Sequence, residues 1–312
     1  MPTVALALGS GGARGMAHIG VIKWLEEHDF EIISIAGSSI GALVGGIYAA
    51  GKLDVYHDWV TGLERSNVLR MLDLSFSRAG LFKGEKIITH LSEMIGDIKI
   101  EDLPIPYTAV ATDINRERAV WLNEGSLFKA IRCSIAVPTV FTPQYHMGRW
   151  LVDGGLVEPV PVAPTLSARA DLNLAVNLNH PTGALGLNFG PELTPRQPDA
   201  KALKDARRPW FSNILNNVLS LHKGDSNKEQ EENSLTMVDV LFRSFDIMQA
   251  QITEARLATY RPDVVIHLER TAGGFFDYDR ASELIQTGYD LAEEALGHFL
   301  PTPKIVPEDD DE

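Results

Sequence analysis

The first fifty residues repeat one arrangement twice: an apolar run, a turn of small residues and then a helical pattern. Val4–Leu8 is continuously apolar and leads through glycines to Met16–Glu27, where apolar residues recur at helical spacing. Ile32–Gly37 leads in the same way through two serines to Ile40–Ala50, which is followed by Gly51, a natural helix end. Apolar strands followed at once by helices are typical of parallel sheets covered on both faces. The pattern predicts an α/β fold with a mainly parallel central sheet.

The rest of the chain supplies further candidates for both kinds of element. Strands are predicted at Tyr107–Thr112, Ala119–Leu122, Trp150–Val152, Leu172–Leu178 and Val264–Leu268. Helices are predicted at Leu53–Leu63, Val68–Leu72, Glu85–Met94, Ser126–Cys133, Leu235–Thr259 and Ala281–Leu296.

Composition sets the expected domain limits. We expect one domain over residues 1–300, with the chemistry-bearing motifs within 4–180 and C-terminal elements over 236–300. Residues 181–235 are rich in Pro, Gly, Asn and charge, which predicts a surface insertion. The acidic end, residues 301–312, is predicted to be a disordered tail.

Charge and cysteine content limit the classes of partner and compartment. There are 28 Lys and Arg residues against 42 Asp and Glu residues, a net charge of −14, which argues against binding to nucleic acid. The single cysteine, Cys133, cannot form an internal disulfide and is interpreted as a small core residue. The apolar stretch Ile40–Gly51 is too short to cross a bilayer, which takes about 20 residues. We expect a cytoplasmic protein; its oligomeric state is left open.

The segment Trp210–Leu219 has an apolar stripe at helical spacing and follows Arg207 and Arg208. One interpretation is packing against the body of the protein or a second subunit. The other is peripheral contact with a membrane, because amphipathic helices with a basic end lie at lipid interfaces.

The sharpest motif is Gly37-Ser38-Ser39-Ile40-Gly41, which matches G-x-S-x-G at a predicted strand-to-helix turn. A nucleophilic serine needs this context, because the sharp bend exposes its hydroxyl and glycines let the neighbouring chain pack closely. The amides at the start of the next helix favour the negative charge of acyl transfer. We therefore take Ser39 as the candidate nucleophile, with Gly37 and Gly41 as supporting residues; a plain Gly/Ser turn is the alternative.

A second motif, Gly9–Gly15, follows the first predicted strand. It misses the dinucleotide-binding pattern G-x-G-x-x-G by one residue in either register, and no Gly-Lys-Ser/Thr follows to make a phosphate-binding loop. Backbone amides near Gly11–Ala13 are better suited to an oxyanion hole. A structural turn remains the alternative.

A base for Ser39 could come from either of two positions. His180 follows a predicted strand, as the late histidine of an α/β-hydrolase triad would. Asp153 follows the apolar Trp150–Val152 and is itself followed by Gly154 and Gly155, a sequence that a simple turn would also explain.

Taken in order, the glycine-rich loop, G-x-S-x-G and D-G-G resemble the patatin-like phospholipase family, and more narrowly its bacterial group similar to the catalytic domain of neuropathy target esterase. The resemblance covers roughly residues 4–180, with a weaker echo in Phe276–Leu291. Ser134–Pro138 and Ala17–Val21 support it, whereas Ser10 replaces a glycine of the family's loop. The matching residues are Gly11, Gly12, Ala13, Arg14 and Gly15 for the oxyanion hole, Ser39 for the nucleophile, and Asp153 with Gly154 and Gly155 for the base.

The resemblance implies a three-layer α/β/α fold and hydrolysis of lipid esters through an acyl-enzyme, with no metal or organic cofactor. In such a Ser39–Asp153 dyad, a buried carboxyl acts as the base because burial raises its pKa. A triad of Ser39, His180 and Asp153, and a non-catalytic lipid-binding protein on the same fold, are the alternatives. Arg14 is expected to stabilise its loop, or else to bind a substrate phosphate, and His18 to pack behind the loop.

Overall fold

The computed structural model of the chain describes residues 1–64, 71, 73, 75, 80–181 and 237–299. The predicted helix Val68–Leu72 lies almost wholly outside these residues. The polar insertion with Trp210–Leu219, and the acidic tail, also lie outside them.

Most predicted elements are present. The helices are α1 (Ala17–Glu27), α2 (Ile40–Ala49), α3 (Leu53–Thr61), α5 (Glu85–Ile95), α6 (Leu127–Ser134), α9 (Met237–Tyr260) and α10 (Ala281–Leu296), with a short 3-10 segment η1 (Gly12–Met16). The strands are β1 (Thr3–Leu8), β2 (Glu31–Ser38), β3 (Gly80–Phe82), β4 (Tyr107–Asp113), β5 (Arg118–Leu122), β6 (Thr139–Phe141), β7 (Gln144–His146), β8 (Arg149–Asp153), β9 (Leu172–His180) and β10 (Val264–Glu269).

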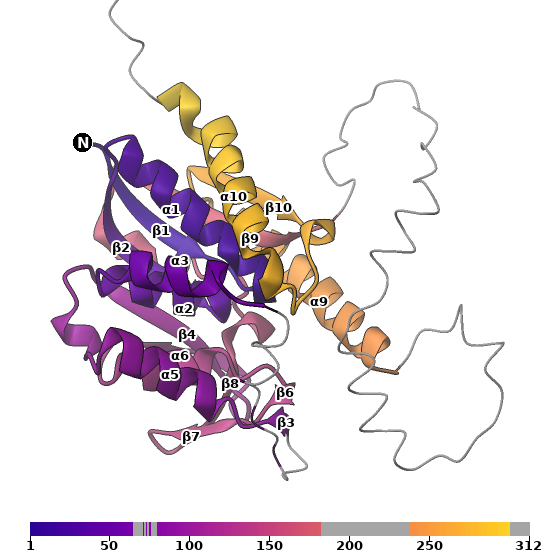
Figure 1. Ribbon diagram of the computed structural model, residues 1–312. Helices are drawn as coiled ribbons and strands as arrows, with labels where there is room; N and C mark the ends of the chain where they lie inside the picture. The colour runs from indigo at the N-terminus through magenta and orange to yellow at the C-terminus, as the bar shows by residue number, and fades with distance from the viewer. Residues whose placement is uncertain (65–70, 72, 74, 76–79, 182–236, 300–312) are drawn as a thin grey trace, which may run out of the picture.

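One mostly parallel sheet forms the centre of the molecule (Figure 1). Its strands follow the order β10-β9-β1-β2-β4-β8-β7, and all neighbours from β10 to β4 are parallel. Strands β5 and β8 pair with β4 in the antiparallel sense, as β7 does with β8. The predicted α/β class is confirmed.

The connections place helices on both faces of this sheet. From β1 through α1 to β2, and through α2 to β4, the chain steps across the sheet in one direction, whereas β9 to β10 through α9 steps in the other. Because such crossovers are right-handed, α1 and α2 cover one face and α9 covers the other. Strand β1 fits this arrangement: Leu6 and Leu8 join the large hydrophobic core, and Ala7 packs in a second core with Leu257 of α9. The three-layer prediction is confirmed.

The register along β4 decides where the candidate site residues meet. Val110 pairs with Ser38 at the end of β2, and the next residue, Ala111, pairs with Asp153 at the end of β8. The same two residues of β4 also pair with β5, which occupies the opposite edge. Strands β2 and β8 therefore share one edge of β4, and their C-terminal ends meet there.

Helices α1 and α10 pack closely enough to need glycine on both sides. A Cβ atom at Gly20 would lie 1.9 Å from the Ile285 carbonyl oxygen, and one at Gly288 would lie 2.0 Å from the Ala17 carbonyl oxygen. These contacts hold α10 against the helix that follows the glycine-rich loop.

Substitution of Gly288 by Ala should lower the free energy of unfolding by about 1–3 kcal/mol, because overpacked contacts cost that much. Gly297→Ala is the matched control near the end of the same helix, since a Cβ atom there would meet nothing within 4 Å. Urea unfolding of both variants measures the difference. Equal stability of the two variants would contradict the close packing.

Candidate active site

Ser39 lies on a sharp bend between β2 and α2. Its φ of 56° and ψ of −122° are strained for a residue with a side chain, as expected of a nucleophile elbow. A Cβ atom at Gly37 would lie 2.3 Å from the Gly41 backbone, and one at Gly41 would lie 2.1 Å from the Leu8 carbonyl oxygen. The two flanking glycines therefore make this tight turn possible.

The segment that ends α6 holds the backbones at both strand ends. The Ser134 hydroxyl accepts a hydrogen bond from the Ser39 N–H at 2.9 Å and donates one to the Val110 carbonyl at 2.5 Å. Two residues later, the Ala136 carbonyl accepts from the Asp153 N–H at 3.0 Å. From the sequence, Ser134 is only part of a supporting match, because nothing local indicates that its hydroxyl reaches two other strands.

The Asp153 carboxyl is buried, with 1% of the residue exposed. One oxygen, Oδ1, accepts a hydrogen bond from the Gly155 N–H at 2.7 Å. The other, Oδ2, has no hydrogen bond of ordinary geometry with the described residues. Burial raises the pKa of Asp153 to about 7, and the nearby Ser39 hydroxyl and the Gly155 N–H oppose part of that rise. This carboxyl can take up and release a proton near neutral pH.

The glycines beside Asp153 are packed tightly. A Cβ atom at Gly154 would lie 2.2 Å from the Val110 carbonyl oxygen. One at Gly155 would lie 2.3 Å from the Gln249 amide nitrogen on α9 and 2.9 Å from Asp153 Oδ1. Helix α9 thus reaches the immediate surroundings of the carboxyl, which no local motif indicated.

The glycine-rich loop presents one residue to the same place. Gly12 lines the pocket that contains Ser39, has a φ of 60°, and begins η1, so its N–H has no acceptor within that segment. The Ala13 N–H is already used, since it donates to the Phe275 carbonyl at 2.9 Å. Gly11 packs against Leu178, and Gly15 packs against Ile40 at the start of α2.

Arg14 ties this loop to parts of the chain far away in sequence. Its buried guanidinium donates to Asn179 Oδ1 at 2.7 Å and to two backbone carbonyls at 3.3 Å, those of Arg270 and Gly273. Asp246 of α9 lies 3.7 Å from the same group. These contacts fit a loop-stabilising role.

His18 lies behind the loop. Its Nε2 is 2.8 Å from the Gly9 carbonyl oxygen, and burial lowers its pKa to about 4, so the ring is neutral and Nε2 carries the donated proton. The ring therefore packs against the loop as predicted.

His180 ends β9, and β1 separates that strand from β2. Its ring packs against that of His267 on β10 in a tilted arrangement, with the ring centroids 4.3 Å apart. Within the described part of the chain, the residues that line the Ser39 pocket do not include His180.

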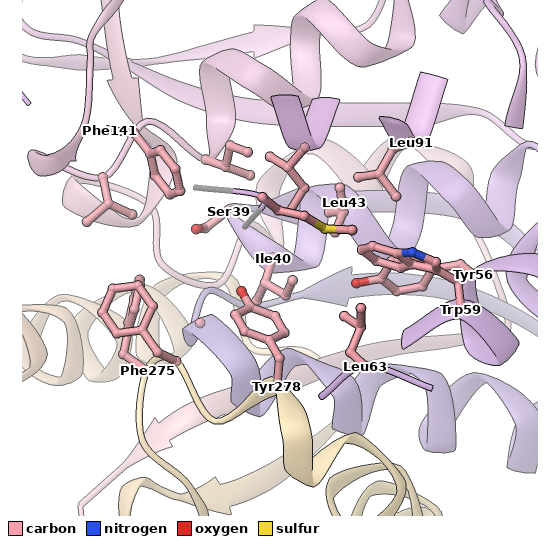
Figure 2. A pocket seen from close by; sticks show the side chains of 16 residues that line it. Ser39, Ile40, Leu43, Tyr56, Trp59, Leu63, Leu91, Phe141, Phe275 and Tyr278 are labelled. Atoms are coloured by element: carbon pink, nitrogen blue, oxygen red, sulfur yellow. The ribbon is translucent and has the colours of Figure 1, made fainter. Parts of the chain in front are cut away.

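An apolar pocket opens beside Ser39. Figure 2 shows the Ser39 hydroxyl toward one end, near Phe141 and Phe275, with Tyr56, Trp59 and Leu91 at the other. Its lining is almost entirely apolar and comes from Gly12, Ser39, Ile40, Leu43, Tyr56, Trp59, Leu63, Met71, Ile87, Leu91, Ile135, Val137, Phe141, Phe275, Phe276 and Tyr278. Such a lining suits a long hydrocarbon chain.

In the part of the chain that the structure describes, no group of three His, Cys, Asp or Glu residues could hold a metal ion. No helix among these residues has the length and hydropathy to span a bilayer.

Comparisons with known proteins give several matches. A model of the family described as patatin-like phospholipase matches residues 6–166. An NTE family protein of Mycobacterium tuberculosis is 38% identical over 333 residues, which covers 96% of this chain and 92% of that protein. Lysophospholipase nte1 of Emericella nidulans is 33% identical over 184 residues, 56% of this chain and 12% of that protein. VipD from Legionella pneumophila aligns with a TM-score of 0.46 and 15% identity, covering 95% of this chain and 67% of that one.

The titration of Asp153 should make stability depend on pH. Its ordinary pKa is 3.8, and burial raises it to about 7, so between these values the folded chain holds a proton that the unfolded chain has lost. Wild type should therefore lose stability as pH rises from about 4 to about 7, by at most about 1.4 kcal/mol per pH unit. The Asp153→Asn variant cannot ionise at this position, so its stability should increase relative to that of wild type as pH rises over that range. Urea unfolding across the range measures the difference, and a constant difference would contradict the raised pKa.

Proposed function

Because the chain belongs to the patatin-like phospholipase family, we propose that it hydrolyses acyl esters of lipids with Ser39 as nucleophile and Asp153 as base. The observation that carries this proposal is the pairing of a strained serine with a buried carboxyl whose pKa is about 7. The register on β4, where Ser38 and Asp153 pair with consecutive residues, supports it further.

In the first half of the proposed reaction, Ser39 Oγ attacks the ester carbonyl carbon as Asp153 takes the hydroxyl proton. The Gly12 N–H, which lines the same pocket, is a donor to the resulting oxyanion. The intermediate then collapses to an acyl-enzyme, and Asp153 returns its proton to the departing alcohol. In the second half, Asp153 takes a proton from water as the water oxygen attacks the acyl carbon. The second intermediate then collapses as Asp153 returns that proton to Ser39 Oγ, which releases the fatty acid and restores the serine hydroxyl.

The oxyanion hole that we propose uses fewer backbone amides than the sequence analysis predicted for this loop. Gly12 is the favoured donor, because the Ala13 N–H already donates to Phe275. Gly11, Arg14 and Gly15 would then support the loop through packing and hydrogen bonds.

A dyad is favoured over a triad with His180. The His180 ring packs against His267, and the intervening strand β1 separates β9 from β2. Asp153, in contrast, pairs with the residue of β4 that directly follows the partner of Ser38. A non-catalytic lipid-binding protein would make no use of a strained serine opposite a carboxyl of raised pKa.

The apolar pocket indicates that the acyl part of the substrate is a long hydrocarbon chain. With the ester carbonyl at Ser39, the acyl chain would extend toward Tyr56 and Trp59 (Figure 2). Phospholipids, lysophospholipids and simple long-chain esters all meet this requirement. The likeness to a protein named as a lysophospholipase adds support for the second of these.

Ser39→Ala and Asp153→Asn should each lower ester hydrolysis by several orders of magnitude, because removing one member of a cooperating nucleophile–base pair usually costs that much. His180→Ala should keep most of the activity. Hydrolysis of a soluble p-nitrophenyl ester measures all three.

Intact mass after treatment with a fluorophosphonate provides the control for this series. Ser39 Oγ should displace fluoride and retain the phosphonyl group in wild type and His180→Ala, whereas Ser39→Ala should stay unmodified. A folded His180→Ala protein as inactive as Ser39→Ala would overturn the dyad. Absence of labelling in wild type would favour the non-catalytic alternative.

Trp59→Ala should shift the substrate preference toward longer acyl chains, because the indole borders the far end of the pocket. Its ring lies 5.7 Å from that of Tyr56 and 5.5 Å from that of His90, centroid to centroid. The ratio of kcat/KM for a long-chain ester to that for a medium-chain ester should rise about tenfold. This corresponds to about two more buried methylene groups, each of which contributes ~0.8 kcal/mol. Val55→Ala, an exposed position of the same helix, is the control and should leave the ratio unchanged. An unchanged ratio in Trp59→Ala would show that the acyl chain of the substrate does not extend toward Trp59.

A further inference from the structure

Four large apolar side chains are exposed together at one end of the sheet. Tyr145 (64% exposed), Met147 (66%) and Trp150 (46%) belong to the hairpin of β7 and β8, and Ile114 (49%) follows β4. The Tyr145 and Trp150 rings lie 5.1 Å apart, centroid to centroid, and the Ile114 N–H donates to the Trp150 carbonyl at 3.1 Å. We call these four residues the hairpin surface.

Met147 occupies a position that folding alone does not explain. It forms the two-residue hairpin turn with Gly148, and both have positive φ, 48° and 74°. Such turns strongly favour Asn-Gly, because Asn adopts positive φ more readily than a long apolar residue does. A methionine at this position makes the turn less stable, and its side chain stays exposed, so burial does not compensate for that loss. An apolar contact outside the folded chain would account for it.

The charges around the hairpin surface are opposite in sign to those of the whole chain. Arg116, Arg118 and Arg149 flank it, and Glu117 is the one acidic residue of the exposed turn from Ile114 to Arg118. Arg116 also pairs with the buried Asp113 carboxylate at 3.4 Å, which leaves a net positive charge from Arg118 and Arg149 against Glu117. The chain as a whole has a net charge of −14. Aromatic side chains bordered by arginine are suited to the boundary between the acyl chains and the anionic head groups of a membrane.

The hairpin is also connected along the chain to the candidate active site. Phe141, the last residue of β6, lines the Ser39 pocket, and β7 begins three residues later at Gln144. The other strand of the hairpin, β8, ends at Asp153. Figure 1 shows β7 at the outer margin of the sheet, with β6 and β8 beside it.

We propose that the hairpin surface is the face with which this protein docks on an anionic lipid membrane. Tyr145, Met147 and Trp150 enter the interfacial region, and the flanking arginines contact lipid phosphates. This inference rests on the proposed function, because a lipid hydrolase would dock on a membrane in order to take its substrate from it. Docking itself requires no catalysis and is therefore tested separately.

The main test uses Met147→Asn combined with Tyr145→Ser, in the Ser39→Ala protein so that no lipid is hydrolysed. Binding is measured by co-sedimentation with vesicles of phosphatidylcholine containing phosphatidylglycerol. The two changes should weaken binding by at least about tenfold, because interfacial affinity follows the apolar area inserted. Met147→Asn alone should keep or raise the melting temperature, because Asn favours the turn. Unchanged binding would overturn the proposal.

A matched control lies away from the hairpin surface. Leu166→Asn removes another exposed apolar side chain, 41% exposed, and should leave vesicle binding unchanged. An equal loss in this variant would show that the contact is not specific to the hairpin surface.

The arginines are tested with Arg116→Gln, Arg118→Gln and Arg149→Gln combined. Binding to vesicles with phosphatidylglycerol should fall, and the residual binding should lose its dependence on salt. With active protein, all the hairpin variants should hydrolyse a soluble short-chain ester at the wild-type rate. Variants that convert a dimer to a monomer in sedimentation, with vesicle binding intact, would identify a second copy of the chain as the occupant and overturn the proposal.

Discussion

The pairing of two strands with consecutive residues of β4 is the constraint on which the candidate site depends. Val110 pairs with the end of β2 and Ala111 pairs with the end of β8. Both pairings use the same edge of β4, because β5 pairs along the opposite edge. Two strands running in opposite directions therefore finish at one point, where Ser39 and Asp153 emerge. A slip of β8 by one residue would turn the carboxyl to the other face of the sheet. The sheet register, more than any flexible loop, sets the geometry of the pair.

The burial of Asp153 has opposite consequences for stability and for chemistry. Removing a carboxylate from water destabilises its charged form, and the few hydrogen bonds available to it offset only part of that cost. The same deficit gives the group a pKa near neutral, at which a carboxyl can exchange a proton with a serine hydroxyl. A better satisfied aspartate would make a more stable protein and a weaker base.

Local signals predicted much of this molecule, and long-range contacts account for what they missed. The turn around Ser39 was predictable because the glycines on either side of it are required by the bend itself. The strands β3, β6 and β7 have three residues each, too few for a periodic pattern to appear. The link from Ser134 to β2 and β4, and the reach of Gln249 toward Gly155, join residues far apart in the chain. Asp153 was predicted as the base only through family resemblance, since an Asp-Gly-Gly sequence by itself is equally a turn.

The hydrogen bonds of Arg14 bear on how much of the chain a working fragment must include. The three ordered motifs lie within residues 6–166, which the family model matches. The groups that neutralise or accept from the buried guanidinium come from later in the chain: Asn179, Asp246, Arg270 and Gly273. A protein truncated at the edge of the matched region would keep all its signature residues and lose every partner of this guanidinium, together with strand β9, which pairs with β1. The signatures thus mark the candidate site, while the contacts that hold its glycine-rich loop come from elements that follow the matched region.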